Sequence, residues 1–95
     1  MLFFAHCVID PEKRGKIEGL RPEHLKYISK HRSMVHYGGV AGTKDFAYSR
    51  ICLFLNLSSE EEARNFVLND PYHLIYSKVE IFNFDQKIPT GNPPP

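Results

Sequence analysis

The apolar and polar positions divide the chain into segments that alternate between strand and helix patterns. The first segment, Leu2 to Ile9, is apolar except for His6 and rich in aromatic and β-branched residues. It is too short for a typical helix and therefore predicts a strand. Both of its alternating faces are apolar, so both must be covered in the folded protein. Helices can cover one face, and a second copy of the chain is the simplest cover for the other.

The next segment predicts a loop followed by a helix. Residues 10–20 are charged and contain two glycines, which favours a loop. Pro22 suits the first position of a helix, because its missing N–H would be unpaired there anyway. Ile28 and other apolar residues follow at helical spacing. The pattern therefore predicts a helix from Pro22 to about Ser33.

Two further strands are predicted in the middle of the chain. Residues 35–40 (VHYGGV) have a strand pattern, in which Gly38-Gly39 indicates a bulge or a close approach by another group. Residues 41–46 have the composition of a turn. Residues 48–57 (YSRICLFLNL) then alternate apolar side chains on one side, which predicts the third strand.

A second helix and a fourth strand complete the pattern. Ser59 and Glu62 have the spacing of a capping box, which opens a helix. An apolar stripe follows, and Asn69-Asp70-Pro71 ends the helix. Residues 76–84 predict the last strand. The tail, residues 89–95, is rich in proline and cannot pair in a sheet.

The order strand, helix, strand, strand, helix, strand predicts an α+β, ferredoxin-like βαββαβ fold. Right-handed crossovers place both helices on one face of an antiparallel four-stranded sheet. We expect one such domain over residues 1–88 and a separate Pro-rich C-terminal tail over residues 89–95.

This topology brings two distant residues together. The start of the first helix carries His24, and the end of the second carries Asp70; these two helix ends meet at one edge of the domain. A carboxylate beside an imidazole orients the ring, and such a pair can take a proton from a substrate and return it elsewhere. We therefore predict His24 and Asp70 as catalytic residues. The alternative is an exposed histidine and an aspartate that only caps a turn.

Three residues near this pair are candidate substrate-binding residues. Arg21 is a candidate for holding an anionic group, Gly39 for letting backbone amides approach an oxyanion, and Tyr72 for offering a ring or hydroxyl. Each also has a purely structural interpretation; Arg21, for example, has the alternative of a solvated side chain.

Composition narrows the classes of function. The chain has 95 residues, with 12 basic and 11 acidic side chains and a formal net charge of +1. This balance argues against a nucleic-acid or anionic-membrane surface. No apolar run approaches the ~20 residues of a membrane span. The N-terminus lacks the basic start and longer apolar stretch of a signal peptide, so we expect a cytoplasmic protein.

The sequence does not predict a metal or cofactor site. The chain has five histidines, but no H-x-x-x-H motif and no dense cluster of cysteine and histidine. The two cysteines, Cys7 and Cys52, both lie in apolar strand segments, which favours buried free thiols over a disulfide. We expect no metal and no cofactor.

Several motifs resemble those of the YCII-related domain family. They are R-P-E-H-L at residues 21–25, Gly38-Gly39 and D-P-Y at residues 70–72, and the opening strand is also similar. The resemblance spans Met1 to about Phe84. It implies a dimeric α+β barrel related to muconolactone isomerase, with a His/Asp site that falls on His24 and Asp70. One relative in that family is a dehydrochlorinase acting on a chlorinated hydroxyhydroquinone.

The chain departs from the family pattern in three places. Val40 stands where the family usually has proline, the connection over residues 41–46 is shorter than usual, and the Pro-rich tail is uncommon. These departures affect the shape of the cleft and hence the substrate.

Three functions remain open at this point. The first is a small cofactor-free enzyme of the lyase, isomerase or dehydrochlorinase type, acting on a small cyclic or enolisable oxygenated substrate. His24 would be its acid/base and Asp70 the residue that orients it. The second is a non-catalytic small-molecule-binding or regulatory module that uses the same cleft. The third is a structural role of the expected homodimer.

Overall fold

The computed structural model describes residues 1–88, and the Pro-rich tail predicted at residues 89–95 lies outside them. Four strands and two helices follow in the order β1 (Leu2–Ile9), α1 (Ile17–Lys30), β2 (Val35–Ala41), β3 (Arg50–Asn56), α2 (Glu60–Asn69) and β4 (Tyr76–Phe84). Three short 3-10 helices connect them: η1 (Pro11–Lys16), η2 (Arg32–Met34) and η3 (Pro71–Ile75).

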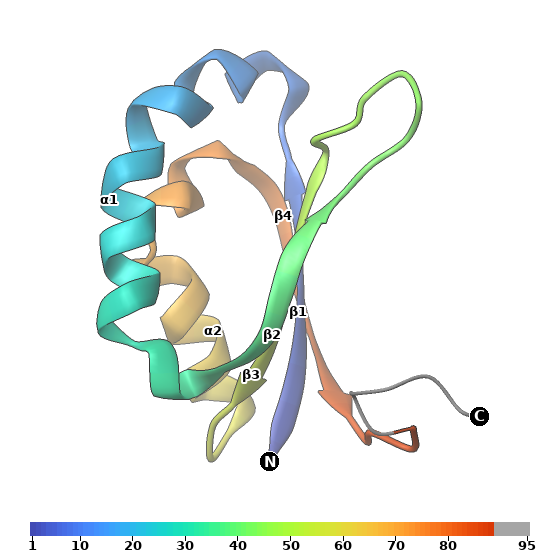
Figure 1. Cartoon of the computed structure of the whole chain (residues 1–95). Coiled ribbons are helices and arrows are strands. Elements are labelled where there is room, and N and C mark those ends of the chain that lie inside the picture. Colours follow the sequence, from blue (N-terminus) through green and yellow to red (C-terminus); the bar gives the residue numbers. More distant parts are fainter. Residues whose placement is uncertain (89–95) are drawn as a thin grey trace, which may run out of the picture.

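The strands form one antiparallel sheet in the order β2-β3-β1-β4. Both helices lie on the same side of this sheet (Figure 1). This arrangement confirms the predicted α+β, ferredoxin-like fold. The predicted Ser59 cap is present, since its side chain accepts a hydrogen bond from the Glu62 N–H at 3.1 Å and α2 begins at the next residue. The Glu62 carboxylate accepts from the Ser58 N–H at 3.0 Å and not from that of Ser59, so the reciprocal half of a capping box does not form.

The hydrophobic core fills the space between the sheet and the helices. Alternate residues of β1 and β3 point into it, because successive strand residues face opposite sides of a sheet. The register places Ala5 between Leu53 on β3 and Ile81 on β4. The other buried apolar side chains of the strands and of α2 are Phe3, Cys7, Ile9, Ile51, Leu55, Ala63, Phe66 and Val67.

The opposite side of the sheet, here called the open face, has no helix over it (Figure 1). Aromatic rings gather there: Phe54 lies 5.0 Å from Phe4 and 4.7 Å from Phe84, between ring centroids. A polar row crosses the same face. The Nε of Arg50 donates to Nε2 of His6 at 3.1 Å, and Nδ1 of His6 lies 3.0 Å from a carboxylate oxygen of Glu80. The doubly apolar pattern of β1 is therefore covered by helices on one side only.

The first helix begins earlier than the sequence predicts. The expected loop over residues 10–20 is wrong, because η1 spans Pro11–Lys16 and α1 already begins at Ile17. The Asp10 side chain caps η1 by accepting from the Glu12 N–H at 3.0 Å, and the buried Ile17 anchors the first turn of α1 in the core. Pro22 consequently lies inside α1. There it removes the hydrogen bond to the Glu18 carbonyl and its ring crowds that carbonyl, a cost of ~3 kcal/mol in a helix interior.

The hairpin between β2 and β3 also differs from the prediction. β3 begins at Arg50 instead of Tyr48, and Ser49 closes the hairpin by donating both its N–H (3.0 Å) and its hydroxyl (3.2 Å) to the Ala41 carbonyl. Of the two features predicted for Gly38-Gly39, the close approach is present at Gly38, where a Cβ would lie 2.8 Å from the Leu53 side chain. A bulge is not present there, because the register of β2 shifts between Val35 and Tyr37 instead.

Candidate active site

The histidine and aspartate predicted as a pair are in direct contact. Nδ1 of His24 lies 2.8 Å from one carboxylate oxygen of Asp70 and 2.7 Å from the other, although the two residues are 46 positions apart. The Asp70 side chain is 1% exposed and the His24 side chain 13% exposed. The pair is therefore shielded from bulk water while the ring keeps an accessible edge.

The helix geometry behind this contact differs from the expectation. His24 lies well inside α1 rather than at its start, because α1 begins at Ile17. Asp70 directly follows α2, as predicted. The end of α2 thus meets the middle of α1, and α1 also packs against η3, the segment that follows Asp70.

The carboxylate of Asp70 is held in place by its own local turn. One oxygen accepts a hydrogen bond from the Tyr72 N–H at 2.9 Å, which caps the start of η3. The Asp70 carbonyl accepts from the His73 N–H at 2.9 Å in the same turn. An N-cap aspartate has little freedom to rotate, so the direction in which it meets the imidazole is fixed.

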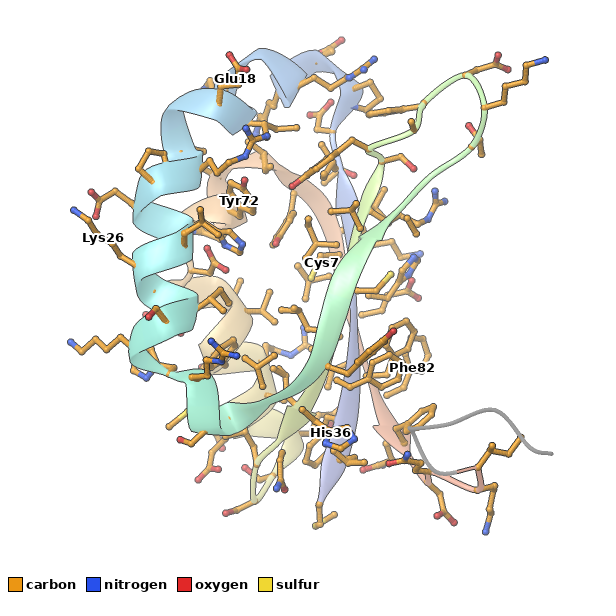
Figure 2. All side chains as sticks on the ribbon, in the orientation of Figure 1. Cys7, Glu18, Lys26, His36, Tyr72 and Phe82 are labelled. Carbon is orange, nitrogen blue, oxygen red and sulfur yellow. The ribbon has the colours of Figure 1, made fainter. Side chains whose placement is uncertain are left out.

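The contact with Asp70 determines how the His24 ring is used. A carboxylate accepts hydrogen bonds, so Nδ1 carries the proton and donates it to Asp70. Nε2 is the ring nitrogen that remains for a ligand. The ring of Tyr72 stacks against the imidazole with centroids 3.8 Å apart and an angle of 9° between the planes. Figure 2 shows Tyr72 between α1 and the sheet.

A cavity of about 230 Å³ lies beside His24, between α1 and the β2–β3 side of the sheet. It forms because α1 makes its main contacts with η1 and η3 rather than with these strands. The walls are mostly apolar. The residues that line the cavity are His24, Ile28, Val35, Gly38, Gly39, Val40, Tyr48, Ile51 and Leu53.

The structure separates the predicted site residues into two groups. His24 and Gly39 line the cavity, and Gly39 contributes backbone alone. Tyr72 is 1% exposed and supports the imidazole from behind instead of lining the cavity. Arg21 is exposed and does not line the cavity either. The nearby phenol of Tyr72 raises the pKa of Arg21.

Tyr48 lines the cavity and is not among the predicted site residues. The alternating pattern of the third strand, extended back from Ile51, assigns Tyr48 to the open face. The strand begins only at Arg50, so this alternation does not apply to Tyr48. The sequence pattern thus carries no signal for its placement in the cavity.

Metal-binding groups, membrane-spanning helices and free thiols are the other features that bear on function. Within residues 1–88, no group of three or more histidine, cysteine, aspartate or glutamate side chains is placed to hold a metal ion. Over the same range, no helix combines the length and the apolar character needed to cross a membrane. Cys7 and Cys52 are free thiols, and Cys7 is buried while Cys52 is half-buried.

The fold and the buried His/Asp pair define a ferredoxin-like α+β domain with one polar pair beside an apolar cavity. No family model matches the chain, and no curated protein matches its sequence. A solved structure is similar: the 5-chloro-2-hydroxyhydroquinone dehydrochlorinase from Burkholderia phenoliruptrix, in complex with 2,5-dihydroxybenzoquinone. The TM-score is 0.77 at 22% identity, and the match covers 90% of this chain and 94% of that one. The likeness extends over nearly the whole fold.

Proposed function

We propose that the chain is a small cofactor-free acid–base enzyme of the YCII-related family. The observation that carries this proposal is the position of His24, whose Nδ1 is bound to the buried Asp70 carboxylate and whose ring lines the cavity. A purely structural histidine has no need of a cavity beside it. His24 is the proposed acid/base, and Asp70 orients it and stabilises the imidazolium that forms.

The chemistry follows from this arrangement. Nε2 of His24 takes a proton from a carbon or hydroxyl acid of the substrate, and the electron pair moves onto a conjugated oxygen. Return of the proton to a different atom gives an isomerase, and departure of a leaving group such as chloride gives a lyase or dehydrochlorinase. A positioned acid/base of this kind typically contributes ~10²–10⁴-fold in rate.

The cavity favours a small cyclic or enolisable oxygenated substrate. Its volume of about 230 Å³ and its apolar walls suit a single ring. The structurally similar dehydrochlorinase, which holds 2,5-dihydroxybenzoquinone, supports a substrate of this size. Proteins of one fold have many different activities, so the proposed function depends on the site itself.

Solvent deuterium exchange tests the proposal before the net reaction is known. A panel of hydroxyquinones, enolisable cyclic acids and lactones is incubated with the protein in D₂O, and uptake of deuterium at carbon is followed by NMR. We expect exchange with at least one class of compound, and its loss in His24→Gln. His36→Gln is the matched control, because His36 is exposed on β2 and does not line the cavity.

Two outcomes would contradict the enzyme hypothesis. Exchange that persists in His24→Gln would remove His24 from the chemistry. Compounds that bind to the wild type without any exchange would favour the alternative, a non-catalytic small-molecule-binding or regulatory module using the same cleft.

A further inference from the structure

Tyr48 is the hydroxyl-bearing side chain that lines the cavity together with His24. The remaining lining residues are glycine or apolar, so any ligand oxygen that needs a hydrogen-bond donor from a wall side chain other than His24 depends on Tyr48. Two neighbours of Tyr48, Tyr72 and Arg21, lie outside the cavity lining.

Arg21 and Tyr72 are neighbours of Tyr48. Arg21 can only donate hydrogen bonds, and the nearby phenols of Tyr72 and Tyr48 raise its pKa. The pKa of Tyr72 is raised, first by its burial and then by the neighbouring Tyr48, so Tyr72 keeps its proton. Each phenol has one proton. Because Tyr48 lines the cavity, its hydroxyl proton can be donated to a partner there.

The backbone around Tyr48 is firmly held. The next residue, Ser49, is buried and donates twice to the Ala41 carbonyl, while its own carbonyl accepts from the Ile9 N–H at 2.9 Å. On the other side, the Arg14 guanidinium lies 4.3 Å from the centre of the Phe46 ring and connects the hairpin to η1. Tyr48 is therefore a fixed donor rather than a mobile loop side chain.

We propose that Tyr48 donates its hydroxyl proton to an anionic oxygen of the ligand, so that the cavity selects single-ring compounds in their phenolate or enolate form. This inference rests on the proposed function and names its substrate class. When His24 removes a proton from the substrate, the electron pair that stays behind becomes an oxyanion. Tyr48, with Tyr72 and Arg21 behind it, is the donor placed to stabilise that charge.

Two probes of nearly equal shape test the inference without requiring turnover. 4-Nitrophenol changes its visible absorbance when it ionises, and nitrobenzene has no ionisable oxygen. We expect the wild type to bind nitrophenolate and to increase the ionised fraction of the probe at a fixed pH. In Tyr48→Phe the affinity for nitrophenolate should fall about tenfold or more, which is typical of a lost hydrogen bond to a charged group. Binding of nitrobenzene should not change.

Control variants distinguish a failure of this inference from a failure of the proposed enzyme. Tyr37→Phe removes a phenol hydroxyl from an exposed position on β2 outside the cavity and should leave both probes unaffected. His24→Gln should abolish deuterium exchange and keep the preference for nitrophenolate. The preference without any exchange in the wild type would refute the proposed enzyme and leave the anion-binding role intact.

Three results would overturn the inference itself. The first is unchanged nitrophenolate binding in Tyr48→Phe. The second is an equal loss of nitrophenolate and nitrobenzene in that variant, which would indicate a damaged cavity wall rather than a missing donor. The third is a wild type that does not bind nitrophenolate at millimolar concentration.

Discussion

The chemistry proposed for His24 depends on which of its ring nitrogens carries the proton. In the structure the carboxylate of Asp70 accepts from Nδ1 with both oxygens, at 2.8 and 2.7 Å. This contact keeps the proton on Nδ1 and leaves the lone pair on Nε2, the nitrogen that the proposed chemistry uses. At the scale of the residue, Asp70 therefore acts by selecting a tautomer.

Replacing Asp70 with asparagine tests this selection. Asp70→Asn keeps the size of the side chain but presents an NH₂ group as well as a carbonyl, so it can hold either tautomer. We expect the preference for Nδ1–H to weaken, as measured by ¹⁵N NMR of the imidazole. Deuterium exchange should fall by ~10² or more, because in the other tautomer Nε2 already carries the proton and cannot act as the base. An unaltered ¹⁵N spectrum would mean that Asp70 does not set the tautomer.

Cys7 provides a prediction of stability against pH. Its thiol is fully buried, and this burial raises its pKa to about 12 from an ordinary value of 9.0. The unfolded chain loses this proton from about pH 9, whereas the folded protein keeps it until about pH 12. The stabilisation is complete below pH 9 and decreases as the pH rises toward 12, at up to ~1.4 kcal/mol per pH unit.

Urea unfolding at a series of alkaline pH values measures this effect. Cys7→Ala has no thiol to ionise, so its free energy of unfolding should decrease less steeply between pH 9 and 12 than that of the wild type. The comparison uses slopes, because the substitution also changes packing and hence the absolute stability. Parallel slopes for the two proteins would show that Cys7 does not contribute to alkaline unfolding.

At the scale of the element, β2 allows a matched comparison of two glycines. A Cβ at Gly38 would lie 2.8 Å from Leu53, which lines the cavity, whereas a Cβ at Gly39 would meet nothing within 4 Å. Neither glycine has a positive φ that would itself oppose substitution. The two positions therefore differ in their surroundings and not in their backbone.

We expect Gly38→Ala and Gly39→Ala to have opposite effects. Gly38→Ala should push Leu53 into the cavity, weaken nitrobenzene binding and lower stability by about 1 kcal/mol. Gly39→Ala should bind the probe as the wild type does, with stability equal or higher by ~0.4–1 kcal/mol, because alanine restricts the unfolded chain. Thermal unfolding and probe titration measure both quantities. Equal losses in the two variants would contradict this account of the cavity wall.

The elements were predictable where several local signals agreed. The capping box at Ser59 and the alternation around Ile51 were sufficient for α2 and β3. The start of α1 was not predictable, because local rules favour Pro22 as the first helical residue. Burial of Ile17 against the core instead extends the helix to an earlier start, and this is a tertiary effect that no local pattern contains.

The candidate site also contains residues that the sequence predicts and residues that it does not. Topology alone brought His24 and Asp70 together, although the start of α1 was predicted at Pro22 instead of Ile17, because an antiparallel helix pair tolerates that shift. Tyr48 could not be found, since its placement depends on where a hairpin closes. The role of Tyr72 as a stacked support depends on side-chain packing, which the sequence also does not specify.

At the scale of the whole molecule, the open face of the sheet is the main unexplained surface. Phe82 is 46% exposed there, and the rings of Phe4, Phe54 and Phe84 lie beside it in the same aromatic group. Apolar side chains gathered in one exposed patch are typical of an interaction surface. We propose that two copies of the chain pack their open faces together to form a homodimer.

Charge substitutions test the homodimer. Phe82→Glu places an unpaired charge in the proposed interface and should convert a dimer to a monomer in sedimentation experiments at micromolar concentration. Leu25→Glu is the control, because Leu25 is 56% exposed on α1, on the other side of the molecule. A wild type that sediments as a monomer, or equal dissociation in the two variants, would refute this interface.

Asp70 makes two structural contacts, and these affect how the protein should lose activity on heating. One carboxylate starts η3 and also joins α2 to α1 across 46 residues. The proposed catalytic geometry therefore depends on contacts that also hold the fold together. Many enzymes lose activity well before they unfold, because a mobile loop carries the site. Here, the curves of heat inactivation and of unfolding followed by circular dichroism should coincide, so that activity itself reports the intact domain.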